Sequence, residues 1–349
     1  MQDLEKKHQR RIRYKGTHPT SYKTKYKEHQ PDKYKDTIEK VMQKGMTPAG
    51  MHRPICVTEI MDFLDIKPGQ IGLDATLGYG GHTLEILKKL NNEGHLYAID
   101  QDPIELLKTK ERLKNMGYDE PILSMHHLNF ADIDVLHAIS GPLDFIIADL
   151  GVSSMQIDNP ERGFSFKLEG PLDLRMNPNK GISASERLIE MTKEEVEGML
   201  IENADEPYAK EIATEITKTI HQGKGITLTS DLYHVISHAL KFLPASKRDE
   251  EIKKSCQRTF QAIRIDVNHE FEVLYAFLEK LPHVLKPQGK VAILSFHSGE
   301  DRLVKKSFQF YERNGAYMRI SDSFIRPSME EQNLNSRSKS AKLRWAIKS

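Results

Sequence analysis

Apolar and polar positions follow two alternating patterns between residues 53 and 150 of this 349-residue chain. Short apolar runs predict buried strands at residues 71–73, 96–99 and 143–148. Amphipathic stretches lie between them at residues 83–90 and 103–113, and Asp102-Pro103 is typical of a helix start. Strands that alternate with helices predict an α/β fold, with a parallel, doubly wound sheet covered by helices on both faces.

The pattern changes after residue 152 to a mostly polar stretch with few strand-like runs. Helical periodicity is found in it at residues 193–201, 209–220 and 230–240. The α/β alternation then resumes, with a helix at 271–285, a turn at 287–289 and a strand at 290–296. We therefore expect one α/β domain, formed by residues 49–152 and 255–349, with a helical domain inserted at residues 153–254.

Residues 1–48 form a basic extension that precedes this domain. Lysines and arginines are interleaved there with Tyr14, Tyr22, Tyr26 and Tyr34, and few aliphatic residues occur. Such a segment cannot build a core of its own, and basic residues beside stackable rings suit RNA. The alternative is a solvated extension without a specific partner. The whole chain has a net charge of only +1, so the distribution of charge, rather than its total, points to nucleic acid.

A glycine-dense turn follows the first predicted strand, in Asp74-Ala75-Thr76-Leu77-Gly78-Tyr79-Gly80-Gly81-His82-Thr83. Asp100 ends the second strand, at the spacing of about 20 residues that is typical of nucleotide sites. Glycines let the backbone approach a ligand, and an acid at this strand end accepts hydrogen bonds from ribose hydroxyls. A dinucleotide loop would have a third glycine where this chain has Thr83. We therefore expect S-adenosylmethionine rather than NAD.

Asp149 follows the apolar run at residues 143–148 and is our candidate catalytic residue. Ligands collect at the carboxyl ends of parallel strands, where this carboxylate would face the cofactor. The exocyclic amine of a nucleobase is a poor nucleophile because its lone pair is delocalised into the ring. A carboxylate that accepts its N–H bonds would turn the lone pair toward an electrophilic methyl group, without a metal or a covalent intermediate.

Arginine and aromatic residues near this strand end suggest a surface for RNA, through phosphate contacts and base stacking. The candidates are Arg162, Phe164, Arg175, Arg258, Arg264 and His297. Core packing is the alternative for any single phenylalanine. His297 also lies near Ser295 and Asp301, but the chain has no G-x-S-x-G elbow and this clustering disfavours a hydrolase triad.

Composition excludes several classes of protein. Cys56 and Cys256 lie far apart without metal-ligand spacing, and scattered histidines such as His126 and His127 are weak evidence for a metal site. No apolar run approaches the roughly 20 residues of a membrane span, and no apolar signal core follows the basic N-terminus. We expect a soluble cytoplasmic protein that needs no metal.

The ordered motifs closely resemble one family, the bacterial 16S ribosomal RNA (cytosine-N4) methyltransferases called RsmH, formerly MraW. The matching segments are residues 52–55, 74–82, 98–103, 149–156, 161–166, 170–176, 258–270, 295–302 and 338–344. The resemblance implies a Rossmann-like, S-adenosylmethionine-dependent enzyme that methylates N4 of a cytidine near the decoding centre, with the helical insertion recognising RNA. The cofactor contacts it implies are Gly80, Gly81, His82, Asp100, Phe130, Asp149 and Gln156. A homodimer is one assembly that we consider.

Several positions depart from the family pattern. The extension precedes the usual start, Gly299 replaces a leucine, and Ser255-Cys256-Gln257 and Ala204-Asp205-Glu206-Pro207-Tyr208 replace other common runs. These changes lie nearer the expected RNA side than the cofactor side, which indicates a divergent branch, such as a second copy. Two alternatives stay open: a methyltransferase that acts on another RNA, and a ribosome assembly factor that keeps the fold without catalysis.

Overall fold

The computed structural model describes residues 54–349, so the basic extension at residues 1–48 lies outside the described residues. A seven-stranded sheet has the order β3-β2-β1-β4-β5-β7-β6. Its strands are β1 (Ile71–Asp74), β2 (His95–Asp100), β3 (Leu123–His127), β4 (Leu143–Asp149), β5 (Leu285–Ser295), β6 (Tyr317–Ile320) and β7 (Lys342–Lys348). Strands β1 to β5 pair in parallel, while β7 runs antiparallel to both β5 and β6. The mostly parallel sheet confirms the predicted fold class.

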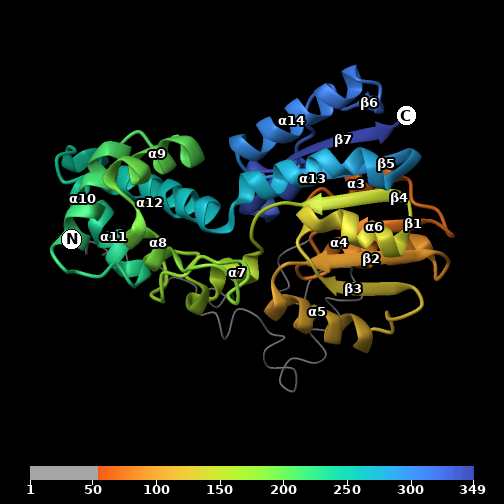
Figure 1. Cartoon of the computed structure of the whole chain (residues 1–349), viewed down its shortest axis with the longest axis horizontal. Coiled ribbons are helices and arrows are strands. Elements are labelled where there is room, and N and C mark those ends of the chain that lie inside the picture. The colour runs from red at the N-terminus through yellow and green to blue at the C-terminus, as the bar shows by residue number, and fades with distance from the viewer. Residues whose placement is uncertain (1–53) are drawn as a thin grey trace, which may run out of the picture.

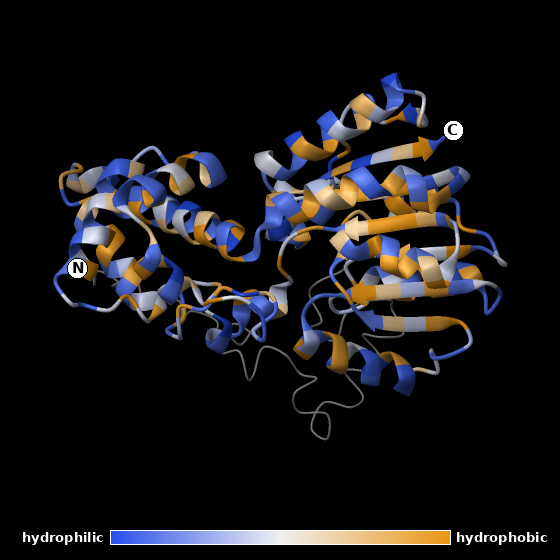
Figure 2. Cartoon of the chain, in the orientation of Figure 1, coloured by the Kyte–Doolittle hydropathy of each residue, from blue (hydrophilic) through white to orange (hydrophobic). Residues whose placement is uncertain are grey.

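Helices cover both faces of this sheet (Figure 1). They are α3 (Val57–Leu64), α4 (Gly81–Leu90) and α5 (Pro103–Asn115) on one face, and α6 (Ile133–Ser140), α13 (Glu270–Val284) and α14 (Ser298–Arg313) on the other. Successive residues of β4 explain this arrangement, because Phe145 and Ile147 pack with the first group while Ile146 and Ala148 pack with the second. The apolar run at residues 143–148 is therefore a strand buried on both faces, and the strands are among the most apolar elements in Figure 2.

A helical domain extends from the sheet as a second lobe (Figure 1). Its helices are α8 (Ala184–Glu190), α9 (Lys193–Ala204), α10 (Ala209–His221), α11 (Thr229–Ala239) and most of α12 (Ala245–Asn268). The short α7 (Ser154–Asp158) and η3 (Pro160–Arg162) lie in the segment that leads into it. The helices share one apolar core that continues along α12 to Ile263. The border expected at residue 254 is thus too early, because it falls inside a continuous helix whose apolar side completes that core.

The turn expected at residues 287–289 lies within the bounds of β5. The register between β4 and β5 shifts there, from Leu143 opposite Leu285 to Phe145 opposite Lys290. Gln288 has a φ of 62°, so the chain makes its bend as an irregularity of the strand. The remaining short elements are η2 (Phe130–Asp132), α15 (Met329–Leu334) and η4 (Ser336–Ser340). Within residues 54–349, no helix has the length and apolar character that a membrane span requires.

Candidate functional site

A cavity of about 600 Å³ opens at the carboxyl ends of β1, β2 and β4. Its walls include the glycine turn after β1, Asp100 at the end of β2 and Asp149 at the end of β4. Gln257, Gln261 and Arg264 of α12 border the same cavity, so it reaches from the sheet to the base of the helical domain. The volume lies in the range of about 300–1,000 Å³ that is typical of small-molecule sites.

The glycine turn is shaped for close approach of a ligand. Gly80 has a φ of 74° and caps α4, so its backbone adopts a conformation that side chains disfavour. A Cβ atom on Gly81 would lie only 2.4 Å from Cγ of Pro54. Glycine at these positions thus lets the turn pack against Pro54, and the first turn of α4 borders the cavity with Gly81 and His82. A helix N-terminus suits a carboxylate such as the amino-acid end of S-adenosylmethionine.

Thr83, the residue that replaces a third glycine, has a defined partner. Its hydroxyl donates to Oδ2 of Asp74 over 2.6 Å, and both side chains are buried. Oδ1 of the same carboxylate accepts the backbone N–H of Thr76 over 3.1 Å. Thr83 thus ties the start of α4 to the end of β1.

Asp100 lies where a ribose acceptor is expected. Its Oδ2 accepts the N–H of Gly78 over 2.7 Å, and its Oδ1 accepts the N–H of Asp102 over 2.8 Å. Burial raises the pKa of Asp100 to about 6, although these two N–H bonds oppose the shift. A carboxylate oxygen has two lone pairs, so the group can still accept from ribose hydroxyls.

Asp149 borders the cavity and has one carboxylate oxygen that is unpaired within residues 54–349. Among the described residues its Oδ1 has no hydrogen-bond partner, while its Oδ2 lies 3.8 Å from Nδ1 of His82. The side chain keeps 30% of its surface exposed, and Thr76 fixes the backbone by accepting the Asp149 N–H over 2.6 Å. Burial raises the pKa of Asp149 to about 6, the charge of His82 lowers it, and the charges of Asp74 and Glu300 raise it further.

The charges around this cavity fit a cationic cofactor. Asp74 and Asp100 repel each other, and Asp149 is repelled by Asp74 and Glu300. The pyrophosphate of a dinucleotide would add negative charge here, whereas a sulfonium ion would offset the repulsion. The residues present therefore fit S-adenosylmethionine, in agreement with the expectation drawn from Thr83.

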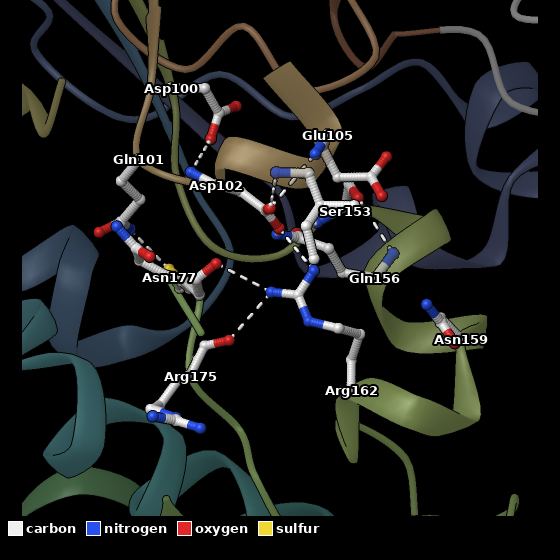
Figure 3. Close-up of polar contacts among 12 residues, drawn as sticks. Asp100, Gln101, Asp102, Glu105, Ser153, Gln156, Asn159, Arg162, Arg175 and Asn177 are labelled. Atoms are coloured by element: carbon white, nitrogen blue, oxygen red, sulfur yellow. Dashed lines mark hydrogen bonds and ion pairs between the residues drawn. The ribbon is translucent and has the colours of Figure 1, made fainter. Parts of the chain in front are cut away.

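The other expected cofactor residues differ in their surroundings. His82 is buried on α4, and its Nε2 donates to the carbonyl of Ile55 over 3.0 Å. Phe130 borders the cavity and packs on Phe277, with ring centroids 5.0 Å apart. The amide of Gln156 is engaged at both ends, since Oε1 accepts the Ser153 N–H and Nε2 donates to Asp102 (Figure 3). Gln156 therefore supports the cavity wall, and direct contact with the cofactor stays a prediction.

The expected RNA residues do not form one surface. Arg162 is buried in an ion pair with Asp102, and Phe164 belongs to the core of the helical domain, which was the alternative for it. Arg175, Arg258 and Arg264 pair with Asp173, Glu206 and Glu270. Of the six candidates, only Arg264 and His297 border the cavity. Direct RNA contact by Arg162 and Phe164 is thus wrong on grounds of burial, and for the others it stays a prediction.

Arg337 is a cavity residue that sequence reasoning missed. It lies on η4, its Nη2 donates to Asp158 over 3.0 Å, and its Nη1 is buried without a hydrogen-bond partner in the described part of the chain. The only available signal was its place beside the motif at residues 338–344. Within the described residues, Arg337 therefore adds an unsatisfied hydrogen-bond donor to the cavity wall, where Asp149 has an unsatisfied acceptor.

The sequence model of the MraW methylase family matches residues 49–349. The chain belongs to the MraW methylase family. It is an S-adenosylmethionine-dependent methyltransferase, and the match spans both the sheet and the helical domain.

Curated relatives resemble this methylase over nearly its whole length. Ribosomal RNA small subunit methyltransferase H 2 of Alkaliphilus metalliredigens is 64% identical over 348 residues, covering 100% of both chains. Methyltransferase H 1 of Lachnoclostridium phytofermentans is 62% identical, covering 98% of this chain and 93% of the relative. Methyltransferase H 2 of Acholeplasma laidlawii is 60% identical, covering 99% of each. The first match includes the basic extension, so this chain shares that length with its relatives; the idea of a second copy stays a prediction.

Gly299, where this methylase departs from the expected leucine, leaves room for Phe271. A Cβ atom there would lie 2.6 Å from Cζ of Phe271, whose ring contacts His297 with centroids 5.7 Å apart. We expect Gly299→Leu to lower the free energy of unfolding by about 1–3 kcal/mol through overpacking. Chemical denaturation of the variant measures this loss.

A compensating variant and a control complete this test. Adding Phe271→Ala to Gly299→Leu should restore most of the lost stability, because the two side chains compete for one space. Gly198→Leu on α9 is the control, since a Cβ there meets no atom within 4 Å. If the double variant is no more stable than Gly299→Leu alone, the overpacking explanation is wrong.

Proposed function

We propose that this methylase transfers the methyl group of S-adenosylmethionine to N4 of a cytidine in small-subunit ribosomal RNA, near the decoding centre. The observation that carries the proposal is the Asp149 carboxylate, which borders a cavity fitted for this cofactor and has one oxygen without a hydrogen-bond partner in the described residues. The relatives are named as methyltransferases of ribosomal RNA small subunits, which supports the class of substrate. The cytoplasm, where ribosomes are assembled, is the place of action that we infer.

Asp149 would act on the amine and not on the methyl donor. S-adenosylmethionine, when bound, supplies an electrophilic methyl group. The carboxylate of Asp149 accepts one N4–H bond and turns the nitrogen lone pair out of the ring plane toward that methyl group. As the N–C bond forms and the S–C bond breaks, the nitrogen becomes acidic and its N4 proton passes to Asp149 or to water. Nδ1 of His82, 3.8 Å from Oδ2, helps to hold the carboxylate in place.

Arg337 offers a donor that suits the rest of the cytosine edge. Cytosine presents one amine donor beside the acceptors N3 and O2, whereas uracil presents N3–H in the middle. An acceptor at Asp149 and a donor at Nη1 of Arg337 match the cytosine pattern. We expect Arg337→Met to raise KM for RNA about tenfold or more, because a buried polar edge would lose its partner, while the affinity for S-adenosylhomocysteine stays unchanged.

Steady-state methylation of small-subunit RNA with radiolabelled cofactor measures the effect of Arg337→Met. Arg319→Met is the matched control, since Arg319 is exposed on β6 beside Trp345 and does not border the cavity. Equal KM values for wild type and Arg337→Met would remove Arg337 from base recognition.

Mass spectrometry of RNA tests the function itself. Small ribosomal subunits from a deletion strain are incubated with the purified enzyme and S-adenosylmethionine, and nuclease fragments are analysed. The proposal predicts one new N4-methylcytidine near the decoding centre. Methylation of a different RNA would show that the enzyme has another substrate. Cofactor binding without any methylation would favour a ribosome assembly factor without catalysis. Two further proposals concern partners. Contact of the basic extension with RNA can be tested by RNA binding of a chain that lacks residues 1–48. A homodimer can be tested by sedimentation.

A further inference from the structure

Arg162 joins the segment that leads into the helical domain to the strand that carries the ribose acceptor. Its side chain is 8% exposed, and Nη1 donates to Oδ2 of Asp102 over 2.7 Å. Nη2 donates to the carbonyls of Arg175 over 3.0 Å and Met176 over 2.8 Å. Figure 3 shows the guanidinium between these partners. One side chain thus holds two parts of the chain that are far apart in sequence.

Asp102 connects this arginine to Asp100. The N–H of Asp102 donates to Oδ1 of Asp100, whose other oxygen holds the N–H of Gly78 (Figure 3 draws the first bond). Oδ1 of Asp102 accepts the N–H groups of Ile104 and Glu105 and so caps α5. Asp102 therefore holds the ribose acceptor through its N–H and α5 through its Oδ1, while its Oδ2 holds Arg162 and Gln156.

The segment at residues 171–176 is also tied to α12. Oδ1 of Asn268 accepts the N–H of Met176 over 2.7 Å, and Nδ2 of Asn268 donates to the carbonyl of Leu174 over 2.8 Å. Asn268 is the last residue of α12, the helix that completes the core of the helical domain and presents Gln257 and Gln261 to the cavity. Continuous hydrogen bonds thus lead from the helical domain through Arg162 to Asp100.

We propose that Arg162 is a positioning residue that couples cofactor binding to the placement of the helical domain, so that S-adenosylmethionine and RNA each strengthen the binding of the other. Arg162 contacts neither ligand in this account. Its fork holds Asp102 and the 175–176 carbonyls at once from two separate nitrogens, whereas the donors of lysine all radiate from one nitrogen and cannot match this geometry. The RNA half of the proposal rests on the function proposed above, whereas the cofactor half does not.

Calorimetric titration of the full chain with S-adenosylhomocysteine tests the cofactor half. We expect Arg162→Lys to weaken this binding about tenfold, within the range of about 5- to 150-fold typical of coupling between sites. Asp102→Asn is the second variant, because asparagine still caps α5 but turns an N–H₂ group toward Gln156 and Arg162. Arg187→Lys is the matched control, since it changes another arginine–aspartate pair, at 2.8 Å, inside the helical domain. Thermal melting verifies that each variant is folded.

RNA binding distinguishes positioning from a direct phosphate contact. For wild type, saturating S-adenosylhomocysteine should tighten RNA binding, and Arg162→Lys should reduce that gain while the salt slope stays unchanged. If Arg162 instead contacted a phosphate, Arg162→Met would lower the slope of log affinity against log salt by about 0.7, the value per phosphate of a single strand. Unchanged S-adenosylhomocysteine affinity in both Arg162→Lys and Asp102→Asn overturns the proposal. A weakened cofactor affinity with no methylation of any RNA would leave the cofactor half standing and remove both the RNA half and the proposed function.

Discussion

Replacing Asp149 by alanine should abolish methyl transfer while the cofactor still binds. The loss of kcat is expected to be at least about 10²- to 10³-fold, the effect of removing one preorganised hydrogen-bond partner of a reacting group. The reason is geometric, since the Asp149 carboxylate borders the cavity and its Oδ1 has no other hydrogen-bond partner in the described structure. Single-turnover methylation at saturating S-adenosylmethionine measures the chemical step, and calorimetry with S-adenosylhomocysteine measures binding separately.

The asparagine variant at the same position should be inactive and yet more stable. Asp149 is an ionised group in a site where burial and the charges of Asp74 and Glu300 oppose its charge. Removing that charge should raise the free energy of unfolding at pH 8 by about 1–2 kcal/mol, an order-of-magnitude figure from the shift in pKa. Asp134→Asn is the control, because that acid is exposed and pairs with Lys280. Near-normal kcat in Asp149→Asn would exclude the carboxylate from catalysis.

Much of the fold could be predicted because the apolar pattern and the layer structure have the same cause. The run at residues 143–148 is apolar throughout since its side chains enter two cores, one on each face of the sheet. Asp100 and Asp149 could be placed in the site because both follow such runs, and the carboxyl ends of parallel strands share one edge. The strand β7 was recognised only as a motif, since its antiparallel pairing with β5 has no signal in a single sequence.

The surroundings of individual arginines could not be predicted. Arg162 and Arg337 are the same residue type, yet one is buried against Asp102 and the other borders the cavity. Burial depends on partners 60 or more positions away, such as Asp102 for Arg162 and Asp158 for Arg337. The border at residue 254 failed for a related reason, because a helix that serves two domains has no change of periodicity where its packing partner changes.

Activity should fall steeply below pH 6 although these groups do not weaken the fold. Asp100 and Asp149 both have a pKa raised to about 6, so both are ionised at pH 8 and become protonated as the pH falls through 6. At saturating cofactor, kcat should decrease about tenfold per pH unit because protonated Asp149 cannot accept the amine as an anion. At low cofactor concentration the decrease should approach about hundredfold per unit, since Asp100 loses its negative charge over the same range.

Stability should change with pH in the opposite direction to activity. The folded state binds these two protons more tightly than the unfolded state, in which aspartate has a pKa near 4. The contribution of both acids to the free energy of unfolding therefore rises as the pH falls from about 6 to 4. Circular dichroism at pH 5 should show a folded protein with little activity. The Asp100→Asn variant separates the two groups, because its affinity for the uncharged S-adenosylhomocysteine should change less with pH between 5 and 7 than that of the wild type, while its kcat at saturating cofactor still falls. A wild-type kcat that stays constant down to pH 5 would show that Asp149 does not act as an ionised acceptor.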